Sequence, residues 1–67
     1  MEEDEFDGSA DALLAALADF TEEQNADHAA RLLAVALRAY SNGIIDEHQL
    51  GDIATLVRRW IRLQQQN

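Results

Sequence analysis

The chain has 67 residues, a net charge of −8 and no cysteine, so it forms at most one small domain without disulfides or thiolate metal sites. The charge disfavours nucleic-acid phosphate or an anionic membrane as the main partner, and it permits a basic protein surface. The longest apolar run, residues 12–18, is far shorter than the roughly 20 residues that cross a bilayer, so we expect no membrane span and a cytoplasmic protein.

Residues 1–8, MEEDEFDG, form an acidic arm whose one aromatic residue is Phe6. Such a segment has too little apolar surface to order itself, so we expect a disordered arm over 1–8 and one helical domain over 9–67. The arm has two interpretations: a solubilising tail, or a segment that docks on a basic surface with Phe6 as its apolar anchor. The residues of that docking arm are Glu2, Glu3, Asp4, Glu5, Phe6 and Asp7.

The first predicted helix spans residues 10–20, with Ser9 as its N-cap. Leu13, Leu17 and Phe20 recur with the helical period and mark its buried face.

The second predicted helix spans residues 22–42. Thr21 followed three residues later by Gln24 has the pattern of a capping box at its start. Two neighbouring apolar stripes follow: Ala26, Ala30, Leu33, Leu37 and Tyr40 in one, and Leu32, Val35, Ala36 and Ala39 in the other.

The third predicted helix spans residues 47–64 and follows a turn. Gly43 can take the left-handed conformation that closes a helix, and Asp46 with Gln49 resembles a capping box. The main apolar stripe is Leu50, Ile53, Ala54, Val57 and Ile61, and Leu56, Trp60 and Leu63 widen it.

The region around the turn does not fit a metal site. With Gly43 as the sixth residue of a calcium loop, Arg38 and Tyr40 fall on ligand positions, and a loop counted from Gly51 fails in the same way. His48 and Asp52 lie four residues apart, but a zinc site needs more ligands. We therefore expect no metal and no other cofactor.

Catalysis and DNA binding are also disfavoured. The glycines are dispersed, and three short helices enclose little space in which a carboxylate could acquire a shifted pKa, so we expect no enzyme. Two helices joined by a glycine-bearing turn are compatible with a helix-turn-helix motif. The start of the third helix, which would meet the base edges, carries Asp46, Glu47 and Asp52.

The predicted fold is all-α: an antiparallel hairpin of helices 22–42 and 47–64, with the shorter helix 10–20 packed on it as a three-helix bundle. By length, the first helix reaches about 16 Å, so Leu13, Leu17 and Phe20 cover one end of the hairpin and cannot reach the turn. The residues expected under the first helix are Ala26, Ala30, Val57, Trp60 and Ile61. The turn end keeps an apolar patch, the expected partner or dimer interface, made of Leu37, Tyr40, Ile44, Leu50 and Ile53.

These features predict a small acidic interaction module that regulates or inhibits a partner protein, with a basic surface as one suitable partner. The uncovered patch also predicts a homodimer. Two alternatives stay open: a small helix-turn-helix DNA-binding regulator, and a structural subunit of a helical assembly.

Overall fold

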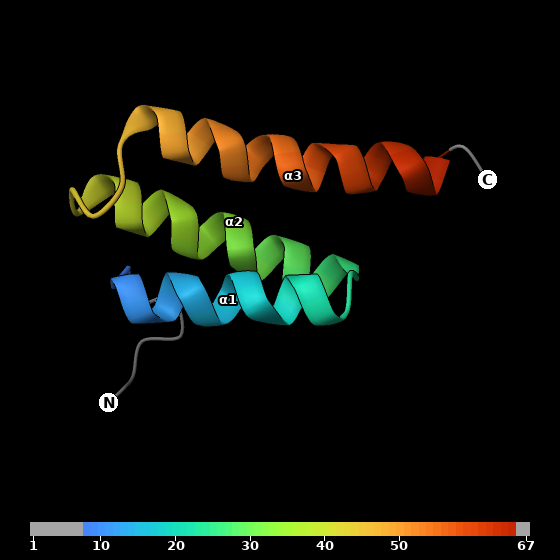
Figure 1. Cartoon of the computed structure of the whole chain (residues 1–67), viewed down its shortest axis with the longest axis horizontal. Helices are drawn as coiled ribbons and strands as arrows, with labels where there is room; N and C mark the ends of the chain where they lie inside the picture. The colour runs from blue at the N-terminus through green and yellow to red at the C-terminus, as the bar shows by residue number, and fades with distance from the viewer. Residues whose placement is uncertain (1–7, 66–67) are drawn as a thin grey trace.

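The computed structural model describes residues 8–65, which form three α-helices and no strand (Figure 1). Helix α1 spans Ala10–Glu22, α2 spans Ala26–Ser41 and α3 spans Glu47–Gln65. The all-α fold is confirmed. The largest difference from the sequence prediction lies between the first two helices, because α1 continues to Glu22 and α2 begins only at Ala26. In the described part of the chain, no helix is both long and apolar enough to span a membrane.

The connection between α1 and α2 corrects the capping-box prediction at Thr21. The Thr21 hydroxyl donates a hydrogen bond to the Leu17 carbonyl at 2.8 Å, inside α1. Asn25 caps α2 instead, since its side-chain oxygen accepts a 2.8 Å hydrogen bond from the backbone N–H of His28. Asparagine is the stronger N-cap residue of the two. The His28 ring also reaches back, with Nδ1 2.7 Å from the Glu23 carbonyl oxygen, and so ties the end of α1 to the start of α2.

The turn between α2 and α3 is as predicted. Gly43 has φ = 77°, and its N–H donates to the Tyr40 carbonyl while that of Ile44 donates to the Ala39 carbonyl, which is the Schellman pattern. Asp46 and Gln49 then form a reciprocal capping box, with side chain to backbone distances of 2.8 and 3.0 Å. Because both ends of the turn are fixed by local hydrogen bonds, α3 starts at a defined residue.

Helix α2 is the element that the other two share. Helices α1 and α3 both pack on it, whereas no Cα atom of α1 lies within 8 Å of a Cα atom of α3. Figure 1 shows α2 running between its two neighbours. The buried core consists of Leu13, Ala16, Phe20, Ala29, Leu32, Val35, Ala36, Ala39 and Val57. Five of these nine residues belong to α2.

The predicted position of α1 is wrong in two respects. First, α1 does extend to the turn end, since Gly8, just before it, packs against Arg38 and Asn42. Second, Ala26, Ala30 and Ile61, which we expected under α1, are exposed. The cause is the connecting segment 23–25, which shortens α2 to 16 residues, about 24 Å, so that the 13 residues of α1, about 20 Å, nearly match it.

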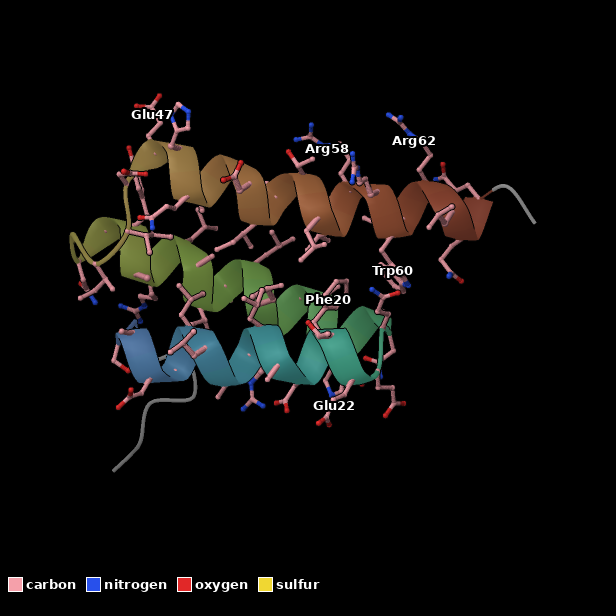
Figure 2. All side chains as sticks on the ribbon, in the orientation of Figure 1. Phe20, Glu22, Glu47, Arg58, Trp60 and Arg62 are labelled. Atoms are coloured by element: carbon pink, nitrogen blue, oxygen red, sulfur yellow. The ribbon has the colours of Figure 1, made fainter. Side chains whose placement is uncertain are left out.

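The predicted contact between α1 and α3 is present, at the end of the bundle that lies away from the α2–α3 turn. The rings of Phe20 and Trp60 meet edge to face, with centroids 5.8 Å apart and planes at 85° (Figure 2). This geometry favours the ring quadrupoles and adds to the burial of both side chains. Phe20 is completely buried, so this pair joins the two outer helices where their backbones stay apart.

Replacing Phe20 by alanine should destabilise the protein by about 3–5 kcal/mol, because the change removes a buried ring and the contact with Trp60. Urea unfolding followed by circular dichroism measures the loss. Leu14→Ala on the same helix is the matched control, since Leu14 is 64% exposed. Equal losses for the two variants would contradict the packing described here.

Asn25→Ala should cost about 1 kcal/mol of stability, the usual effect of removing an N-cap. Thr21→Ala should leave stability nearly unchanged, because the Thr21 hydroxyl only bonds back within α1 and alanine has the higher helix propensity. Thermal unfolding compares the two. A larger loss for Thr21→Ala would place the start of the second helix at Thr21 after all.

Candidate interaction surface

The five residues predicted to form the interface fall into two groups. Leu37, Tyr40 and Ile44 are 56%, 44% and 47% exposed. Leu50 and Ile53 are half-buried and pack against the core. We call the exposed group, Leu37, Tyr40 and Ile44, the turn-end patch.

The turn-end patch continues outward from the core. Leu33, Leu37 and Tyr40 are spaced by four and three residues, so they share one side of α2. Leu33 is half-buried against the core and the next two are exposed. The same apolar stripe therefore passes from the interior to the surface towards the turn, and Ile44 extends it into the turn itself.

Charged residues flank the patch on both sides. Arg38 follows Leu37 directly and is exposed, and Asp46 and Glu47, also exposed, come just after the turn. Figure 2 shows Glu47 at the start of α3, pointing away from α2. In the sequence, exposed acidic residues therefore follow the patch, and an exposed guanidinium group lies within it.

The structure exposes further apolar side chains: Leu14 on α1, and Leu56, Ile61 and Leu63, which the sequence placed in the apolar stripe of the third helix. Ile61 and Leu63 lie in the last turns of α3, which has 19 residues against 16 in α2. Figure 1 shows the end of α3 projecting past the start of α2. A sequence prediction that took Asn25 as the N-cap of α2 would have made α2 shorter than α3. The difference in length would then have indicated that the end of α3 projects.

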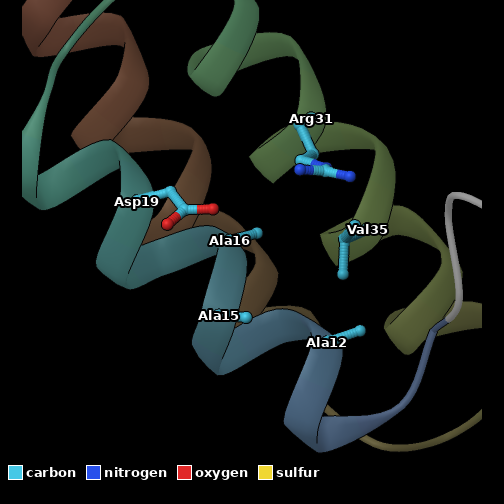
Figure 3. Close-up of a pocket in the computed structure, with 6 residues that line it drawn as sticks. All are labelled: Ala12, Ala15, Ala16, Asp19, Arg31 and Val35. Carbon is cyan, nitrogen blue, oxygen red and sulfur yellow. The ribbon is translucent and has the colours of Figure 1, made fainter.

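A hollow of about 210 Å³ lies between α1 and α2 (Figure 3). Ala12, Ala15, Ala16 and Val35 line most of it, and Asp19 of α1 and Arg31 of α2 stand at its rim. Its lining includes no hydroxyl, thiol or imidazole group that could act as a nucleophile or general base. The hollow results from small side chains meeting between two helices.

The histidines are separate in the structure. His28 bonds to the connection between α1 and α2, and His48 is exposed in the first turn of α3. Within residues 8–65, no three histidine or acidic side chains gather as a metal-ion cluster. His48 and Asp52 share the exposed side of α3 without a third ligand.

A second hollow lies on the exposed side of α2, close to the start of the described chain. Ala34, Leu37, Arg38 and Ser41 line it, and its volume is about 330 Å³. These positions are three and four residues apart, so they form one helix face. Leu37 belongs both to this hollow, which we call the α2 hollow, and to the turn-end patch.

The predicted arm residues Glu2, Glu3, Asp4, Glu5, Phe6 and Asp7 lie outside the described residues. Gly8, the last residue assigned to the arm, is described and buried. A Cβ atom on Gly8 would lie 2.7 Å from the carbonyl carbon and the Cβ atom of Arg38 and from Nδ2 of Asn42. Only glycine fits at this approach, and the approach fixes where the arm leaves the domain.

Comparison with known proteins gives no relative: the chain matches no family model, no curated protein and no solved structure.

Adding micromolar Ca²⁺ or Zn²⁺ should leave the melting temperature unchanged, because His48 and Asp52 alone cannot complete a coordination shell. Differential scanning calorimetry with and without each metal measures this. His48→Ala serves as the comparison: an upward shift in the unmodified protein that this variant loses would establish a metal site on α3.

Proposed function

We propose that this protein is a small, acidic, non-enzymatic interaction module that regulates or inhibits a partner protein by docking through the turn-end patch. The observation that carries the proposal is the exposure of Leu37, Tyr40 and Ile44, three large apolar side chains within eight positions of the chain. Clustered apolar side chains that stay exposed in a folded domain are typical of interaction sites, and tyrosine is favoured at such sites.

The charges around the patch indicate the kind of partner. Asp46 and Glu47 are exposed and follow Ile44 closely in the sequence, and the whole chain carries a net charge of −8. A complementary partner has an apolar groove for Leu37 and Tyr40 with basic residues at the edge facing α3. Such charges mainly accelerate association and select the partner, so binding should weaken as salt concentration rises.

When no other partner is present, the simplest way to cover the turn-end patch is to pack it against the same patch of a second copy of the chain. In a two-fold dimer the same patch of each copy meets its equivalent, so Leu37, Tyr40 and Ile44 of both copies lose contact with water together. We therefore propose that the chain forms a homodimer, and that a partner protein can displace one copy from the patch of the other.

The DNA-binding alternative receives less support from the surface of α3. Its first turns expose Glu47 and Asp52, whereas Arg58, Arg59 and Arg62 lie towards the far end. A recognition helix meets base edges through its N-terminal part, and carboxylates there repel phosphate.

Leu37→Asp or Tyr40→Asp should abolish the dimer without unfolding the domain, because each places a charge in the interface at a position that is exposed in the free chain. Sedimentation equilibrium at tens of micromolar measures the oligomeric state. Leu14→Asp is the control, since Leu14 is even more exposed but lies on α1. A monomeric unmodified protein would rule out the homodimer.

Affinity capture from the native cell with the same variants tests for a partner protein. A protein captured from the native cell by the unmodified chain and by Leu14→Asp, but lost with Leu37→Asp, binds through the turn-end patch. Proteins captured equally by all three would show that binding uses another surface and would contradict the proposal.

A further inference from the structure

The three helices are arranged like three of the four helices in a four-helix bundle. In Figure 1, α1 and α3 run in the same direction on either side of α2, which runs the opposite way. Both pack on α2, but no Cα atom of α1 lies within 8 Å of a Cα atom of α3. In a closed three-helix bundle each helix packs on both others, whereas the first and third helices of an up-down-up-down four-helix bundle lie diagonally across its core. The observed packing corresponds to the second case.

The Phe20–Trp60 contact and the shape of the molecule agree with this comparison. Diagonal helices of a four-helix bundle meet only through side chains in the middle of the core, as these two rings do with centroids 5.8 Å apart (Figure 2). The molecule measures 40 × 27 × 14 Å, so its helices form a shallow layer. A fourth helix would lie along one broad side of this layer, against both α1 and α3, and we call this the open side.

Apolar side chains of α3 continue from the core onto the open side. Leu56, Trp60 and Leu63 are four and three residues apart, so they share the side of α3 on which Trp60 meets α1. Trp60 is half-buried, whereas Leu56 and Leu63 are exposed. The stripe that begins at the contact between the outer helices therefore ends in uncovered leucines.

Helix α1 contributes two leucines to the same side. The hollow of Figure 3 is lined on α1 by Ala12, Ala15, Ala16 and Asp19. Leu14 and Leu17 are each two residues, about 200° of helix rotation, from residues of that hollow, so they lie on the other flank of α1. Leu17 is half-buried against the core and Leu14 is exposed.

The two helices that border the open side differ in charge. Helix α1 carries three acidic residues and no basic one, whereas α3 carries three arginines and no acidic residue after Asp52. Arg59 is three residues from Leu56 and four from Leu63, so it lies beside them on α3. A helix docked on the open side is therefore complementary if it has basic residues towards α1 and acidic residues towards Arg59.

We propose that the open side binds an amphipathic helix of a partner protein, which completes a four-helix bundle. The docked helix runs antiparallel to α1 and α3 and packs an apolar stripe on Leu14, Leu56 and Leu63. Its flank next to α1 is basic and its flank next to Arg59 is acidic. The open side contains no residue of the turn-end patch, so this inference does not depend on the proposed function.

A synthetic peptide tests the site directly. It is a helix of about 18 residues, close in length to α2 and α3, with a leucine stripe, lysines on one flank, glutamates on the other and no tryptophan. Trp60, the chain's single tryptophan, is half-buried at the site, so its fluorescence reports docking. We expect a saturable shift of Trp60 emission to shorter wavelength.

Three variants locate the bound peptide. Leu14→Asp and Leu63→Asp should each weaken binding about tenfold or more, because each places a carboxylate in the apolar contact. Leu37→Asp should bind the peptide as the unmodified chain does. All three positions are exposed in the free chain, so the variants should keep its circular dichroism spectrum. Absence of binding, or binding that survives both Leu14→Asp and Leu63→Asp, would overturn the proposal.

A second peptide, with the lysines and glutamates exchanged, tests the charge assignment. It should bind the unmodified chain more weakly than the first peptide, and Arg59→Glu should reduce this difference. Equal or tighter binding of the second peptide by the unmodified chain would overturn the proposed partner chemistry. Self-association that Leu14→Asp abolishes and Leu37→Asp does not would show that a second copy of the chain covers the open side, and it would also overturn the proposal.

Discussion

The close approach of α1 and α3 to α2 determines the rest of the structure. Ala29, Ala36 and Ala39 have exposures of 5%, 0% and 0%, and their short side chains bring the neighbouring helices near the backbone of α2. Leu32 and Val35 fill the remaining space and are completely or almost completely buried. A larger residue at one of these alanines would push the helices apart, since a packed core tolerates added volume poorly.

This arrangement also explains which apolar residues stay outside. A helix that serves two neighbours buries one broad side and leaves its other side free. The stripe of alanines, Leu32 and Val35 occupies the buried side of α2, so Leu37 and Tyr40 remain on the surface. The turn-end patch is therefore a result of how the core is built, although α1 reaches the turn end.

The sequence predicted the features that depend on local hydrogen bonds. Gly43 and the Asp46–Gln49 pair define the turn completely, because their partners lie within a few residues. The predicted start of α2 was wrong because Thr21 and Asn25 are both acceptable N-cap residues. Periodicity could not decide which of two adjacent apolar stripes is buried, since that choice depends on contacts with α1 and α3. The arm's point of departure at Gly8 depends on a contact with α2 that no local pattern reveals.

Charge is distributed unevenly over the fold. Glu22 lies at the outer edge of α1 and Arg58 and Arg62 at the outer edge of α3, on opposite sides of the bundle (Figure 2). All ten acids of residues 1–29 precede the first arginine in the sequence. Among the described residues, α1 carries Asp11, Asp19 and Glu22 and no basic residue, so a charged partner meets a more acidic surface at α1 than at the end of α3 that carries the arginines.

The order of the helices has a consequence for cooperativity. Each helix packs on its neighbour in the sequence, as the repeats of a linear array do, so the contacts are local and favour rapid folding. In such an array, an outer helix can detach while the other pair stays intact. The Phe20–Trp60 contact opposes this, because it links the first helix to the third. Trp60 is the chain's single tryptophan, so its fluorescence separates undocking of an outer helix from the loss of helical structure that circular dichroism records.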